Sequence, residues 1–85
     1  MSFTILVADD SSTIRQAISI CLGGPNYNIQ TAENGEIALS IAKNNKPDLI
    51  IADVYMPEKD GIELCRAIKK DPNLKATPVV LLSSH

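Results

Sequence analysis

Residues 47–61 read PDLIIADVYMPEKDG, and this stretch decides the fold. The unbroken apolar run at residues 49–52 predicts a short strand that is buried on both faces, as in a parallel sheet covered by helices. The run ends at Asp53, a poor strand former, at the point where open α/β sheets have their ligand crevices. The pair at residues 56–57 is Met-Pro, which restricts the backbone that follows. We therefore expect a stiff loop to present the Asp53 carboxylate until a helix begins at Asp60.

Composition indicates one small globular domain, residues 1–85, with a limited core. The chain has 85 residues, of which 45% are hydrophobic. Eight basic and ten acidic residues give a formal charge of -2 without a basic cluster, so we expect no nucleic acid and no membrane among its partners. The N-terminus lacks a signal-peptide pattern, and no apolar run approaches the length of a membrane span. We expect a cytoplasmic protein.

Strand and helix patterns alternate along the chain. Apolar and β-branched runs predict strands at residues 3–8, 27–32, 49–52 and 79–82. The second run alternates with polar residues and fits an outer strand, whereas the other three are expected to be buried. Three helices are expected between the strands, with apolar stripes at helical spacing. These stripes are Ile14, Ala17, Ile18, Cys21 and Leu22 in the first helix, Ile37, Ala38, Ile41 and Ala42 in the second, and Ile62, Cys65 and Ile68 in the third.

Polar residues mark where these helices begin. Ser11 or Ser12 is suited to cap the first helix, and Asn34 suits the start of the second. Asp60 and Glu63 have the spacing of a capping box, which predicts the start of the third helix.

Alternating strands and helices of these lengths predict an α/β fold, a doubly wound parallel sheet with right-handed crossovers. We expect the strand order 2-1-3-4, with the first helix on one face of the sheet and the other two helices on the opposite face. Cys21 and Cys65 then lie on opposite sides of the sheet, so a disulfide between them is not expected. Both are interpreted as buried, reduced thiols.

The same strand order predicts an acidic site. Asp9 and Asp10 follow the first strand and Asp53 follows the third, so adjacent carboxyl ends bring these three side chains together. Taken alone, Asp9 and Asp10 would be interpreted as a turn and a helix cap, but the matching position of Asp53 favours a functional site. Crowded carboxylates repel one another, and Mg²⁺ is a cation that binds carboxylates together with phosphate oxygens. An aspartate neutralised in this way can attack phosphorus in line and form an aspartyl-phosphate. Ser83, at the end of the fourth strand, is a candidate donor to a phosphoryl oxygen.

Four segments together resemble the receiver domain of a two-component response regulator. They are DDS at residues 9–11, AxNGxxAL at 32–39, PDLIIADxxMPxxDG at 47–61 and PVVLLS at 78–83. A single acidic pair or a lone Met-Pro would not be specific, whereas the set is. The resemblance spans the chain and implies the flavodoxin-like form of the doubly wound fold.

The resemblance also implies a role for each site residue. Asp53 would accept a phosphoryl group from a histidine kinase or a phosphotransfer protein. Asp10 and Asp53 would bind Mg²⁺ directly, Asp9 directly or through water, and Tyr55 through its backbone carbonyl. Ser83 matches the switch hydroxyl. Such a protein is a signalling phosphoacceptor and not an enzyme, beyond catalysing its own phosphorylation and dephosphorylation.

The chain departs from the family pattern at its C-terminal end. Receivers have five strands and five helices, and only four strands and three helices are expected here. The truncation removes the fifth strand, with the lysine that pairs with the acidic pocket, and the last two helices. The fourth strand is then an open apolar edge, which predicts self-association or docking to another polypeptide.

Two other classes of function compete with the phosphoacceptor. A receiver-like half-domain that is never phosphorylated would act as an interaction or dimerisation scaffold, and the missing lysine favours it. A Mg²⁺-dependent phosphohydrolase would need a substrate pocket and a general acid, and the short chain shows neither.

Overall fold

The computed structural model describes residues 3–83, in which strands and helices alternate. The elements are β1 (Phe3–Ala8), α1 (Ser12–Leu22), β2 (Tyr27–Ala32), α2 (Gly35–Asn45), β3 (Leu49–Asp53), α3 (Gly61–Lys70) and β4 (Val79–Leu82). The strands lie where the sequence predicts them, except that β3 extends by one residue to include Asp53. In residues 3–83, no helix is long and apolar enough to cross a membrane.

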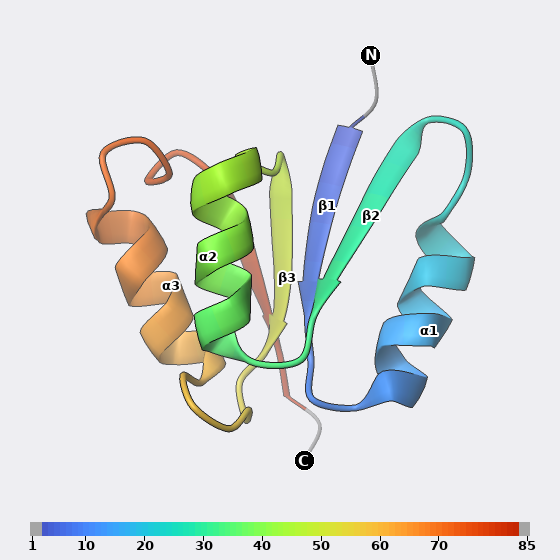
Figure 1. The fold of residues 1–85 in the computed structure, drawn as a ribbon, viewed down its shortest axis with the longest axis horizontal. Coiled ribbons are helices and arrows are strands. Elements are labelled where there is room, and N and C mark those ends of the chain that lie inside the picture. The colour runs from blue at the N-terminus through green and yellow to red at the C-terminus, as the bar shows by residue number, and fades with distance from the viewer. Residues whose placement is uncertain (1–2, 84–85) are drawn as a thin grey trace.

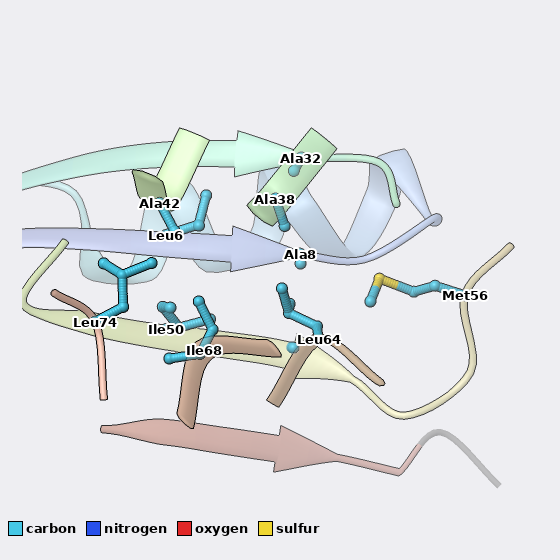
Figure 2. Close-up of a cluster of buried hydrophobic side chains, with 11 residues drawn as sticks. Leu6, Ala8, Ala32, Ala38, Ala42, Ile50, Met56, Leu64, Ile68 and Leu74 are labelled. Carbon is cyan, nitrogen blue, oxygen red and sulfur yellow. The ribbon is translucent and has the colours of Figure 1, made fainter. Parts of the chain in front are cut away.

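The strands form one parallel sheet in the order β2-β1-β3-β4, which confirms the predicted topology. In Figure 1 all the strand arrows point toward the lower edge, so the carboxyl ends of the strands share one side of the molecule. Helix α1 covers one face of the sheet, and α2 and α3 pack together on the other face (Figures 1 and 2). This is the doubly wound, flavodoxin-like arrangement.

Side chains cap the helices as the sequence predicts. Of the two candidates for α1, Ser11 is the cap, and its hydroxyl oxygen accepts a hydrogen bond from the Ile14 amide at 3.3 Å. At α3 the Glu63 amide donates to the Asp60 carboxylate at 2.8 Å, and the Asp60 amide donates to the Glu63 carboxylate at 3.4 Å. This reciprocal pair is the predicted capping box, and it starts α3 directly after the loop that leaves β3.

The core lies between the sheet and the α2–α3 pair (Figure 2). Its members come from three strands, from both helices of the pair and from the loops around them. They are Leu6, Ala8, Ala32, Ala38, Ala42, Ile50, Ala52, Met56, Leu64, Ile68 and Leu74. In Figure 2 the Met56 side chain points from its loop toward Ala8 and Leu64. The loop that carries the Met-Pro pair is thus anchored in the core.

The predicted apolar stripe of α3 was partly wrong. Ile68 is fully buried, but Ile62 is 43% exposed and Cys65 is only half-buried. Leu64 is fully buried in their place. Gly61, Leu64 and Ile68 are spaced three and four residues apart, so they share the face that meets the sheet, and Ile62 is rotated away from it.

The α1 face of the sheet and the β4 edge are both poorly covered. None of the α1 residues, all of which are described, is buried, and Cys21 is exposed. The prediction that Cys21 is a buried thiol was therefore wrong, although both cysteines are free in the described part of the chain. The apolar run of the fourth strand indicated burial, whereas the missing fifth strand predicted an open apolar edge. Val80, Leu81 and Leu82 are 45%, 38% and 40% exposed, which agrees with the open edge. The reason is that β4 pairs on one side only, while α1 packs over β1 and β2.

Candidate functional site

Three carboxylates meet at the carboxyl edge of the sheet. Ala8 and Ala52 are partners in the register of β1 and β3, so the next residues, Asp9 and Asp53, extend neighbouring strands. These two side chains are buried, with 5% and 4% of their surface exposed, while Asp10 is exposed. One carboxylate oxygen from each of the three lies within 4.8 Å of the others. The structure therefore groups the carboxylates that the sequence singled out.

Each buried carboxylate is held by the turn that follows it. The Ser11 amide donates a hydrogen bond to Oδ1 of Asp9 at 2.8 Å, and the Tyr55 amide donates to Oδ1 of Asp53 at 3.2 Å. In both cases the donor lies two residues after the acid, so the backbone itself directs the side chain back over the end of its strand.

The electrostatics of the cluster oppose full ionisation. Burial raises the pKa of the Asp9 carboxyl above its ordinary value, and the Ser11 amide hydrogen bond lowers it. The negative charges of Asp53 and Asp10 raise this pKa further, while the Arg15 guanidinium has the smallest influence and lowers it. A cation bound at the cluster would offset the repulsion between these negative charges.

The donor set fits Mg²⁺. All three side chains offer oxygen, which is the ligand that Mg²⁺ prefers, and the mixture of two buried groups and one exposed group leaves one side of the cluster open to water. Mg²⁺ is bound in proteins by one or two carboxylates and keeps several waters or phosphate oxygens. Asp9, Asp10 and Asp53 are therefore the residues that could hold the ion.

The loop after Asp53 is fixed against α3 and β4. The Val54 amide donates to the carbonyl of Leu82 at 2.8 Å, and the Gly61 amide donates to the carbonyl of Val54 at 3.1 Å. A Cβ atom on Gly61 would meet the main-chain oxygen of Asp53 and lie 2.9 Å from its carbonyl carbon. Only glycine permits α3 to begin this close to the end of β3.

Tyr55 and Ser83 lie at the same edge of the sheet. The Tyr55 side chain is 55% exposed, and its backbone contacts the site through the amide that donates to Asp53. Leu82 is the register partner of Asp53, so Ser83 follows directly beyond the end of the neighbouring strand. Ser83 is exposed. The backbone amide of Tyr55 therefore contacts the Asp53 carboxylate, and Ser83 follows the strand that pairs with β3.

Two contacts around the site were missed from the sequence. Nη1 of Arg15 donates to the backbone carbonyl of Asp9 at 2.6 Å, and Nζ of Lys59 lies 3.4 Å from the Glu36 carboxylate. The Arg15 contact did have a signal in the sequence. Arg15 lies in the first half of α1, shortly after Asp9, and side chains on a helix point back toward its N-terminus. The second joins two segments that are distant in sequence and left no such signal.

Comparisons with known proteins show the family of the chain. The chain matches the family model of the response regulator receiver domain over residues 5–85. It is 51% identical over 82 residues to histidine kinase P4 of Formosa agariphila, covering 96% of this chain and 6% of that protein. It is 39% identical over 84 residues to the response regulator PleD of Caulobacter vibrioides, covering 99% of this chain and 18% of that protein. The structure of the chemotaxis response regulator CheY4 of Vibrio cholerae superposes with a TM-score of 0.93 at 35% identity, covering 100% of this chain and 71% of that one. The chain thus spans a small part of the curated relatives it matches.

Proposed function

This chain belongs to the family of response regulator receiver domains, and we propose on that basis that Asp53 is its phosphoacceptor. The observation that carries the proposal is the grouping of three carboxylates, with Asp53 buried at the end of a central strand. A carboxylate oxygen of Asp53 attacks the phosphorus of the donor, the bond from phosphorus to the donor's leaving group breaks, and an aspartyl-phosphate results.

We assign the other site residues around this transfer. Asp10 and Asp53 bind Mg²⁺ directly, Asp9 binds it directly or through a water, and the backbone carbonyl of Tyr55 contributes a further oxygen. The ion supplies positive charge that neutralises the carboxylates and the transferred phosphoryl oxygens. The Ser83 hydroxyl donates to a phosphoryl oxygen, and this contact switches the surface around β4. Leu82 is the register partner of Asp53, and the position of Ser83 one residue further along the neighbouring chain segment supports this role.

The phosphodonor is a histidine kinase or a phosphotransfer protein. Similarity to response regulators and to a histidine kinase supports a partner of this class. Phosphorylation then changes the affinity of the domain for its output partner, because the new charge biases a two-state surface at the site.

Intact-mass spectrometry tests the proposal directly. The chain is incubated with acetyl phosphate with and without Mg²⁺, alongside the variants Asp53→Asn and Asp48→Asn. Asp48 is an exposed acid that accepts from the Thr4 amide in the turn before β3, at the opposite end of that strand. We expect a Mg²⁺-dependent phosphoryl adduct on the wild type and on Asp48→Asn, and none on Asp53→Asn. A folded wild-type chain that gains no adduct would reject the phosphoacceptor role.

The exposed edge of the sheet favours a second candidate, an interaction scaffold that pairs with a second copy of the chain. Val80, Leu81 and Leu82 are apolar and exposed on a strand whose outer backbone edge has no neighbouring strand among residues 3–83. Edges of this kind pair with other chains. Analytical ultracentrifugation over a concentration series would show a dimer that Val80→Lys weakens. A monomer at every concentration would exclude the scaffold.

A further inference from the structure

Arg15 reaches back from α1 to the end of β1. Its Nη1 donates to the backbone carbonyl of Asp9 at 2.6 Å in a part-buried position. Hydrogen bonds from a charged donor are shorter and about twice as strong as neutral ones. This contact therefore fastens the main chain of Asp9 at the point where the strand turns toward α1.

The Asp9 side chain depends on that main chain. Its Oδ1 accepts from the Ser11 amide at 2.8 Å, so the turn from Asp9 to Ser11 sets the direction of the carboxylate. Arg15 holds the backbone at one end of this turn, and the Ser11 cap of α1 holds the other end. Together they fix which way the Asp9 carboxylate faces.

Packing does not account for this contact. None of the α1 residues, all within the described part of the chain, is buried, and Arg15 itself is half-buried. The contact is also directed, since Nη1 donates to the carbonyl oxygen of Asp9 at 2.6 Å. A positive charge that acted only through its field would not need this geometry.

We propose that Arg15 is a positioning residue of the acidic site, which keeps the Asp9 carboxylate facing Asp10 and Asp53. The inference deepens the proposed function, because it assigns a residue outside the carboxylate cluster to the metal site. Mutating a residue that orients a metal ligand from behind typically costs about 10–100-fold in metal affinity.

The two roles that the Arg15 side chain could have predict opposite changes in Mg²⁺ affinity. If Arg15 acted only as a positive charge, removing it would tighten Mg²⁺ binding, because like charges repel. If it positions Asp9, removing it weakens Mg²⁺ binding despite the lost repulsion. The sign of the change therefore separates the roles.

The first measurement is made on the metal-free chain by NMR amide exchange. We compare Arg15→Met, Arg15→Lys and Arg66→Met, the last of which removes an equal charge from an exposed position on α3. We expect the Ser11 amide to exchange about fivefold faster in Arg15→Met, the scale of one lost hydrogen bond. The Ile37 amide, which donates to the Asn34 cap of α2, is the internal reference and should not change.

The second measurement is Mg²⁺ affinity by isothermal titration calorimetry on the same variants. Arg15→Met is expected to bind Mg²⁺ about tenfold more weakly, as for other residues that orient metal ligands. Arg15→Lys should recover most of the loss, because lysine also donates to a carbonyl, and Arg66→Met should match the wild type.

The outcomes separate this inference from the proposed function. An unchanged Ser11 amide in Arg15→Met, or Mg²⁺ binding that stays equal or tightens, would overturn the role of Arg15. A folded wild-type chain that binds no Mg²⁺ would reject the proposed metal site, and the metal-free exchange data would still decide whether Arg15 positions Asp9.

Discussion

The two faces of the sheet differ in how they are covered. On the α2–α3 face, Leu64 and Ile68 are fully buried against the strands, and the two helices also contact each other. On the opposite face α1 packs alone and has no buried residue among its positions, all of which are described. Yet the two helical stripes look alike in sequence. The difference shows that an apolar stripe becomes core only when neighbouring elements close around it.

The strands carry the same contrast. Ile50 and Ala52 face the α2–α3 side and are fully buried, whereas Ile51, between them, faces the α1 side and is only half-buried. Near β1 the α1 face is well covered, since Ile5 and Val7 are buried. Coverage on this face therefore fades from β1 toward β4, and the following predictions test how far the two faces differ.

The largest expected difference is between matched truncations on the two faces. Ile68→Ala on α3 should lower the free energy of unfolding by about 2–5 kcal/mol, because it opens a cavity in the core. Ile18→Ala on α1 should cost about 1 kcal/mol or less, because the side chain is only half-buried. Urea unfolding followed by circular dichroism measures both. Equal losses would show that the two faces are equally packed.

A matched pair of glycines compares the site with the turn after α1. Gly61→Ala should lower the free energy of unfolding by about 1–3 kcal/mol, because the added Cβ meets the Asp53 main chain and forces α3 away. Gly24→Ala should change little, since no atom lies within 4 Å of the place that the added Cβ would take. Chemical unfolding measures the free energy of unfolding of both variants. A Gly61→Ala variant as stable as the wild type would mean that α3 has room to move.

Asp9 directly follows β1 at the carboxyl edge of the sheet, and its raised pKa makes stability depend on pH. Because its pKa is raised in the folded chain, the folded state holds this proton more tightly than the unfolded state does. The metal-free chain should therefore lose stability as the pH rises from the ordinary aspartate range through the raised pKa. Asp9→Asn should remove this loss and stabilise the metal-free chain at neutral pH by about 1 kcal/mol.

Urea unfolding at several pH values in the presence of a chelator measures this effect. The difference between Asp9→Asn and wild type should shrink as the pH falls below the aspartate range. A variant that is less stable than the wild type at neutral pH would contradict the assignment of the raised pKa to the folded state.

The smallest expected effect concerns the ion pair between Lys59 and Glu36. This pair joins the loop after β3 to the start of α2, and its side chains are 23% and 62% exposed. A double-mutant cycle with Lys59→Met and Glu36→Gln should give a coupling energy of about 0.2–1 kcal/mol that falls with added salt. A coupling that salt does not change would indicate that packing, and not charge, holds this loop.

Local patterns were enough to predict the strands, since they show which runs are apolar and where each run ends. The strand order and the meeting of the three carboxylates also needed the order that doubly wound sheets commonly have. The patterns were not enough to predict that Ile62 points outward or that α1 has no buried residue, because burial depends on which elements lie next to each other. The Arg15 contact depends on the side-chain path across the first turns of α1, which spacing alone does not specify.

The pairing of β1 with β3 has a consequence for the lifetime of the chain. Asp9 and Asp10 are separated from Asp53 in sequence by α1, β2 and α2, so the unfolded chain does not hold the three carboxylates together. A ligand that bridges them binds the folded state alone, and its free concentration then adds to the apparent stability by mass action. Resistance to proteolysis should accordingly rise with the free concentration of that ligand. The rate at which the protein is degraded then also reports whether the site is occupied.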